Sequence, residues 1–70
     1  MSEIYDKKHE AHVWFDKLWK NHEERDYYYK RLSNDMGLSE ETCHFSMMTM
    51  EQLDKAIAII KRYWWEKYDR

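Results

Sequence analysis

The sequence predicts an all-α fold, a compact three-helix domain with a short extra helical turn between the second and third helices. Two observations carry this prediction. The 70 residues include one glycine and no proline, so the chain lacks the residues that supply the many tight turns of a β-fold. Apolar side chains also recur three and four positions apart, which places them on one face of a helix. We expect residues 1–70 to form a single helical domain, because a chain this short builds one core at most.

The first helix is predicted over residues 3–20. Its apolar side chains share one arc when successive residues are turned by about 100°. They are Ile4, Ala11, Phe15, Leu18 and Trp19. His12 lies near the same arc, so we interpret it as a packed histidine bonded to a carboxylate. A metal site with His9 is the weaker alternative, since HEAH is one residue too short for the HExxH zinc motif.

The second and third helices are predicted over residues 24–36 and 50–68. Asn21 can act as the N-cap of the second helix, and Gly37 ends it because glycine adopts the left-handed conformation without steric cost. Thr49 followed by Gln52 is a capping-box pattern that opens the third helix. The short turn is predicted over residues 39–44, with Ser39 as its cap.

Composition excludes several classes of function. Twelve basic and fourteen acidic side chains give a formal net charge of −2, which disfavours a general polyanion binder. No apolar run approaches the roughly 20 residues that cross a bilayer, and no signal-peptide pattern is present. A single cysteine, Cys43, cannot form an intrachain disulfide. We therefore expect a cytoplasmic protein that acts without a membrane.

No residue pattern indicates an enzyme. Cys43 and His44 are adjacent and could suggest a nucleophile with its base. Neighbouring side chains on a helix point about 100° apart and do not face each other, however. The chain also has no glycine-rich oxyanion loop. We predict no catalytic residues, no metal ligands, no cofactor and no small-molecule substrate.

The strongest functional signal is a surplus of aromatic side chains. Four Trp, six Tyr and two Phe in 70 residues are more rings than three helices can bury. The helical arcs place about half of them inward, Tyr63 and Trp64 among them. The predicted partner-binding residues are the outward or boundary rings Trp14, Tyr27, Trp65 and Tyr68. Tyr and Trp dominate binding hot spots, so we expect docking onto a protein partner or self-association.

The alternative is a nucleic-acid-binding accessory that uses a helix-turn-helix-like turn at 32–45. Its contact residues would be Ser39, Thr42 and His44. The second helix of such a unit should present basic or amide side chains to the bases. Here Glu40 and Glu41 occupy that position and would repel phosphates, so nucleic acid is the less favoured partner.

From about residue 9 to 57, the chain resembles a family of mostly phage- and prophage-borne "zinc-finger-containing domain" proteins of unknown function. The matching stretches are HEAHVWFDKLWK, then Arg25 with Tyr29 and Leu32, then GLSEETCHFSMM leading into Glu51. This looks like the C-terminal helical half of that family. In the family, this half resembles a module that follows a four-cysteine zinc ribbon, which the single Cys43 cannot build. Ser46, Arg31 and Leu53 also stand where the family tends to have glycine, tryptophan and cysteine.

The resemblance implies a phage context but no activity, and a zinc role that belongs to the ribbon does not transfer. With the aromatic surplus, it leads us to expect a small phage-type accessory protein in the host cytoplasm. Such a protein would bind and block a host factor. A defence nuclease complex, in the manner of anti-CRISPR proteins, is one candidate target.

Overall fold

A computed structural model describes residues 3–68 and confirms the predicted fold class. Its elements are α1 (Glu3–Asp16), α2 (His22–Met36), the 3-10 helix η1 (Phe45–Met47) and α3 (Met50–Tyr68). Within these residues the backbone forms no strand. The short extra turn between the second and third helices is therefore present.

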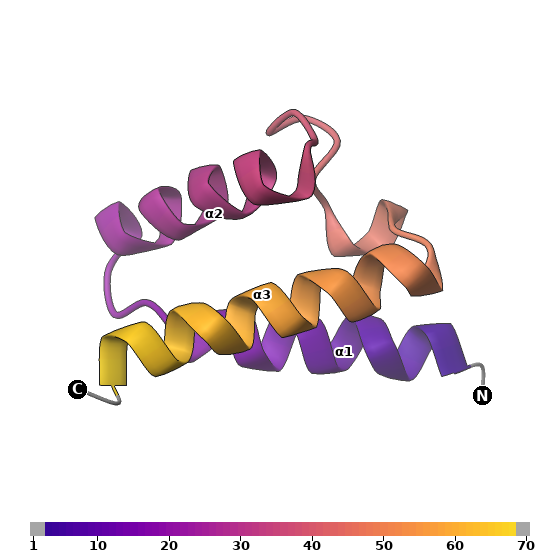
Figure 1. Ribbon diagram of the computed structural model, residues 1–70, viewed down its shortest axis with the longest axis horizontal. Helices are drawn as coiled ribbons and strands as arrows, with labels where there is room; N and C mark the ends of the chain where they lie inside the picture. Colours follow the sequence, from indigo (N-terminus) through magenta and orange to yellow (C-terminus); the bar gives the residue numbers. More distant parts are fainter. Residues whose placement is uncertain (1–2, 69–70) are drawn as a thin grey trace.

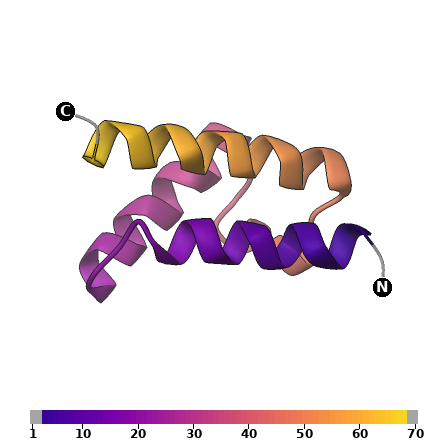
Figure 2. The same cartoon turned by 90° about the horizontal axis from the view of Figure 1, so that it is seen from below.

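The three long helices pack as a parallel pair crossed by a third helix. Figure 1 shows α1 and α3 running in the same direction, with α2 returning the opposite way. Figure 2 shows α1 and α3 side by side, and α2 lying obliquely across them. The side-chain pairs agree with this order, because Lys7 contacts Asp54 while Trp14 contacts Trp64 further along both helices.

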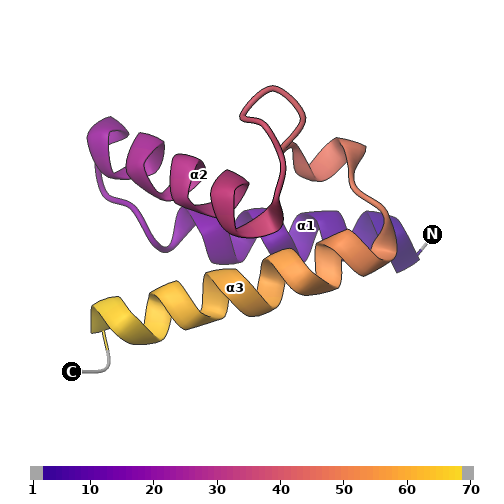
Figure 3. The same ribbon diagram turned by 45° about the horizontal axis from the view of Figure 1, so that its top comes forward.

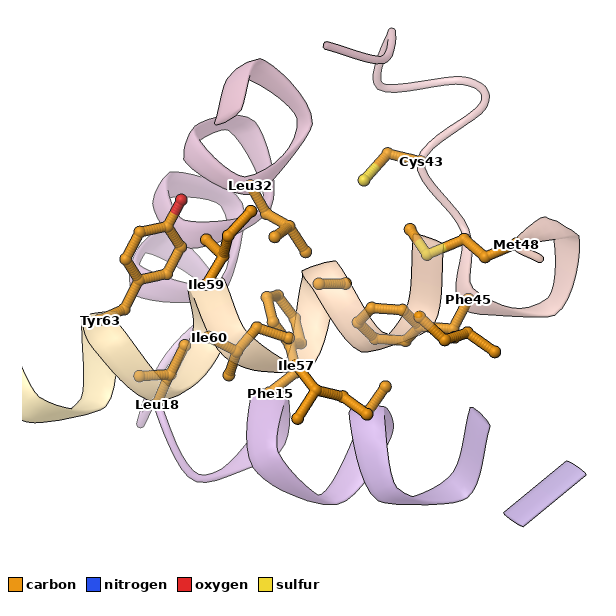
Figure 4. Close-up of a cluster of buried hydrophobic side chains, with 13 residues drawn as sticks. Phe15, Leu18, Leu32, Cys43, Phe45, Met48, Ile57, Ile59, Ile60 and Tyr63 are labelled. Carbon is orange, nitrogen blue, oxygen red and sulfur yellow. The ribbon is translucent and has the colours of Figure 1, made fainter. Parts of the chain in front are cut away.

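The core lies where α1, α2, η1 and α3 meet. Figure 4 shows apolar side chains from all four elements converging on this space. Its thirteen members are Ala11, Phe15, Leu18, Leu32, Cys43, Phe45, Met48, Leu53, Ala56, Ile57, Ile59, Ile60 and Tyr63. α3 supplies six of them, because it is the helix with neighbours on two sides.

Two side-chain caps and one glycine cap fix three of the helix ends, as the sequence predicts. The Asn21 carboxamide oxygen accepts the backbone N–H of Glu24 at 2.9 Å. Gly37 ends α2 in the left-handed conformation, with φ of 71°. At the start of α3, the Thr49 hydroxyl accepts the N–H of Gln52 at 3.2 Å, and the Gln52 side chain accepts the N–H of Thr49 at 2.9 Å. These bonds satisfy backbone groups that have no partner inside a helix.

Two predicted helix boundaries are wrong. α1 ends at Asp16 rather than Lys20, and α2 begins at His22 rather than Glu24. The Asn21 cap has an extended backbone (φ −139°, ψ 168°) and starts α2 at the next residue, His22. After Asp16 the chain leaves α1 through a tightened turn in which the Leu18 N–H donates to the Phe15 carbonyl at 3.0 Å.

The segment between α2 and α3 contains two separate turns (Figure 3). The first covers residues 40–42, and the Ser39 carbonyl accepts the N–H groups of Thr42 and Cys43. The second is η1, which carries Phe45 into the core. The helical turn predicted over residues 39–44 is thus a non-helical turn at residues 40–42. The 3-10 helix η1 follows it.

The C-terminal end of α3 is bonded to the connection between α1 and α2. The Lys67 ammonium donates to the Leu18 carbonyl and pairs with the Glu24 carboxylate. Leu18 is fully buried, so this ammonium satisfies a carbonyl next to the core. No helix in residues 3–68 is long and apolar enough to cross a membrane.

Candidate functional site

Three of the four predicted partner-binding rings come together around a fourth ring, Trp64. Its centroid lies 6.2 Å from Trp14 on α1, 6.3 Å from Trp65 and 5.1 Å from Tyr68. We call these four residues the aromatic patch. The patch spans the seam between α1 and α3, because Trp14 alone comes from α1 and the other three come from α3.

The aromatic patch is accessible and has lysines around it. Trp65 is 57% exposed and Tyr68 43% exposed, whereas Trp14 and Trp64 are half-buried. The ammonium groups of Lys61 and Lys17 lie 5.0 and 5.4 Å from the Trp14 ring. A cation above an indole face is attracted by the ring quadrupole, by about 0.5–1 kcal/mol at exposed sites. The patch is therefore apolar at its centre and positive at its edge.

Tyr27 belongs to a different group of rings. It is as exposed as Trp65, at 57%, but its ring packs on Tyr28 at 5.1 Å. Tyr28 in turn contacts Tyr63 at 6.0 Å, on the side of α3 that faces α2. No ring contact joins Tyr27 to the aromatic patch among residues 3–68, so the predicted set of four divides into three and one.

Sequence reasoning missed Trp64 as the centre of the patch. Its position on the apolar arc of α3 predicts burial, and the ring does pack against the core. It is only half-buried, however, and another large ring, Trp14 of α1, meets it edge-on. The adjacent tryptophans at 64 and 65 are the one sequence signal that could have indicated it, since neighbours on a helix cannot both face the core.

The three residues of the alternative nucleic-acid prediction lie in the segment between α2 and α3. The Ser39 and Thr42 hydroxyls bond each other at 2.9 Å and also bond the backbone of the turn. His44 is exposed, and its Nδ1 lies 2.6 Å from the Tyr29 hydroxyl. Residues 37–49 contain no α-helix, so this segment offers no second helix to enter a groove.

The two histidine interpretations have different outcomes. Cys43 is 2% exposed and His44 is exposed, so the two side chains differ in burial, although neither residue lies in a helix as the prediction assumed. His12 is also exposed, and its ring meets Phe45 edge-on at 4.9 Å. The prediction for His12 is thus right in part: the ring packs on Phe45, but the side chain is exposed and has no carboxylate bond among residues 3–68.

The chain is a three-helix module with a lysine-edged aromatic patch on its surface. A family model described as "zinc-finger-containing domain" matches residues 1–63, and the chain belongs to that family. No curated protein and no solved structure matches it.

The family description raises the question of a zinc site. Zinc in proteins is held by Cys, His and acidic side chains, with four ligands in structural sites. Within residues 3–68 no group of three or more such side chains is placed to hold a metal ion. Cys43, the sole cysteine, is buried in the apolar core. The described residues do not fit a zinc ion, and we assign the metal no role in this part of the chain.

Proposed function

We propose that this chain is a protein-binding module whose contact surface is the aromatic patch. The observation that carries the proposal is the meeting of Trp14, Trp65 and Tyr68 around Trp64 across the α1–α3 seam. Rings of this size supply most of the binding free energy at many interfaces, because they bury a large area at low entropic cost. Isolated surface aromatics would carry no such meaning.

The charges around the patch favour an acidic partner surface. Lys17 and Lys61 lie above the ring of Trp14. Complementary charges at an interface accelerate association and select against like-charged partners. The partner we propose is therefore a protein with an apolar pocket bordered by carboxylates.

The biological setting is a proposal that rests on the family resemblance. We propose a small phage-type accessory protein that acts in the host cytoplasm and blocks a host factor by covering its working surface. A defence nuclease complex, as for anti-CRISPR proteins, is the candidate target. Steric blocking requires a binding surface and no active site, which fits a chain with no apparent catalytic pattern.

The test compares two aromatic substitutions that are matched for exposure. Trp65 and Tyr27 are both 57% exposed, but only Trp65 lies in the aromatic patch. We expect Trp65→Ala to weaken binding to a partner captured from host lysate at least about 30-fold, since hot-spot truncations cost 2 kcal/mol or more. Tyr27→Ala should leave binding within about threefold of the wild type.

Circular dichroism on each variant confirms that helicity is kept, and affinity is measured with the purified partner. Equal losses for Trp65→Ala and Tyr27→Ala would remove the aromatic patch from consideration. Light scattering on the purified chain tests self-association: a dimer that Trp65→Ala dissociates makes a second copy the partner.

The nucleic-acid alternative has its own readout. Labelled duplex and single-stranded oligonucleotides are titrated at low and high salt. Two results together would favour nucleic acid over a protein partner: binding that falls steeply as the salt concentration rises, and weaker binding when Thr42 or His44 is substituted.

A further inference from the structure

A polar cleft lies away from the aromatic patch, where α1, α2 and the segment before η1 meet. Its volume is about 170 Å³, and its polar lining includes His12 and Asp16 from α1, Arg25 and Tyr29 from α2, and His44. The buried rings of Phe15 and Phe45 form its apolar side. Drug-sized ligands occupy pockets of roughly 300–1,000 Å³, so this cleft suits a single small group.

Arg25 lines this cleft, and its side chain is 45% exposed. Its guanidinium lies 5.8 Å from the centroid of the Tyr29 ring, which orients it. Its one ion pair among residues 3–68 is with Asp26 at 3.9 Å, the outer limit of such a contact. A guanidinium offers five N–H donors in a rigid fork that matches the oxygens of an oxyanion.

The Tyr29 hydroxyl fixes the orientation and proton position of His44. This hydroxyl contacts both the Cys43 carbonyl and His44 Nδ1, the latter at 2.6 Å. A carbonyl only accepts, so the single hydroxyl proton goes to Cys43, and the Tyr29 oxygen accepts the Nδ1–H of His44. Nε2 of His44 is then left for another partner.

The charges of the cleft select among oxyanions. Asp16 also lines the cleft. An anionic ligand that lies beside this carboxylate must donate a hydrogen bond to it, because a carboxylate only accepts. A phosphate monoester has a second pKa near 6 and so still carries a proton in part of its population near neutral pH. Carboxylates and phosphodiesters carry none. A phosphate monoester can therefore accept from Arg25 and donate its proton to Asp16.

We propose that this cleft binds a phosphate monoester, with Arg25 donating to its oxygens, Asp16 accepting its proton, and His12 and His44 at its edge. The site is independent of the proposed protein-binding surface, because it shares no residue with the aromatic patch. A monoester also agrees with the chain's charge: one phosphate group needs local donors, whereas a nucleic-acid backbone needs many basic side chains.

The experiment is an amide NMR titration of the whole chain at constant ionic strength, with adenosine 5′-monophosphate as the probe. We expect saturable shifts at Arg25 and His44 with a dissociation constant of the order of 1 mM. Adenosine, which lacks the phosphate, and 3′,5′-cyclic AMP, a diester of the same nucleoside, should give no saturable shift. Phosphoserine, a monoester without a nucleoside, should bind comparably if the phosphate is the recognised group.

Two substitutions and one control sharpen the result. Arg25→Gln should weaken the binding of the monophosphate about tenfold or more, because a charged hydrogen-bonding partner is lost. Asp16→Asn replaces a carboxylate by an amide that can donate. The affinities for the monoester and for the cyclic diester should therefore differ less in this variant than in the wild type. Arg31→Gln, on the same helix but bonded to Glu66 at 2.9 Å, should not change binding.

The proposal is overturned if adenosine shifts the same amides as its monophosphate, or if Arg25→Gln binds like the wild type. It is also overturned if no probe gives a saturable shift. Because these titrations involve no protein partner, their failure would leave the aromatic-patch proposal unaffected.

Discussion

Two arginines of α2 each lie against a tyrosine ring, and they differ in what completes the contact. Arg31 lies 4.3 Å from the Tyr63 ring and pairs with Glu66 of α3 at 2.9 Å. Arg25 lies 5.8 Å from the Tyr29 ring, and among residues 3–68 its one ion pair is the distant contact with Asp26. We call Arg31 with Tyr63 the closed pair, and Arg25 with Tyr29 the open pair.

The hydroxyl groups of the two tyrosines show the same difference. The Tyr63 hydroxyl donates to the Asp35 carboxylate of α2, so the closed pair is bonded to acids of both helices. The Tyr29 hydroxyl donates to a backbone carbonyl and orients His44. The closed pair joins α2 to α3, whereas the open pair directs its remaining donors to a cleft. An arginine on a tyrosine ring therefore stabilises the fold where acidic side chains of both helices bond to the pair. It lines a cleft where they do not.

The largest effect that distinguishes the pairs is the loss of the buried ring. Tyr63 is 3% exposed, so Tyr63→Ala should lower the free energy of unfolding by about 3–5 kcal/mol. That is much of the roughly 4–10 kcal/mol expected for a domain of this length. Tyr29 is only partly buried, and Tyr29→Ala should cost less. Urea unfolding followed by circular dichroism measures both, and equal losses would erase the distinction between the pairs.

Alkaline pH should weaken the closed pair before the rest of the fold. Burial, followed by the hydrogen bond to Asp35, raises the pKa of Tyr63 well above its ordinary value of 10.0. Burial raises the pKa of Tyr29 less strongly. The folded chain thus keeps these protons after the unfolded chain has lost them. Their contribution is complete below about pH 10 and falls above it, by at most about 1.4 kcal/mol per pH unit for each proton.

Urea midpoints at pH 9, 10 and 11 test this dependence. Lysines also titrate in this range, so the informative quantity is the difference between wild type and Tyr63→Phe. The phenylalanine variant should lose less stability between pH 9 and 11. Parallel curves for the two proteins would contradict the assignment of the pKa shift to Tyr63.

The smallest expected effect is the difference in free energy of unfolding between the Arg31 and Arg25 variants. The Arg31–Glu66 pair is partly exposed, and such ion pairs contribute about 0.2–1 kcal/mol. Arg31→Gln should therefore lower the free energy of unfolding by less than about 1 kcal/mol, and Arg25→Gln should leave it almost unchanged. Thermal unfolding at low and high salt checks this, since screening should reduce the Arg31 effect. A larger loss for Arg25→Gln would mean that the open pair is structural.

The sequence predicted the fold best where a cap fixes a helix end. Gly37 and the pair Thr49 and Gln52 act locally, so the end of α2 and the start of α3 agree with the structure. The end of α1 was wrong, because Leu18 is buried without being helical. A buried residue just past a helix continues the apolar period and looks like one more turn.

The candidate sites were predictable only in part, since they form between helices. Periodicity gives the direction of a ring on its own helix and therefore selected Trp65 and Tyr27 alike. Which of them meets other rings depends on how the helices pack. The cleft was missed for the same reason. Arg25, Tyr29 and His44 all lie in the stretches that carry the family resemblance, but nothing in the linear order shows that they converge.

The bonds of Lys67 have a consequence for how this molecule opens. One ammonium joins the final turn of α3 to the carbonyl of Leu18 and to Glu24. Segments 49 and 43 residues apart in sequence are thereby coupled. A helix end usually frays independently of the core, but fraying here would also release the α1–α2 connection. Hydrogen exchange should therefore report these two distant segments as a single unit that opens and closes together.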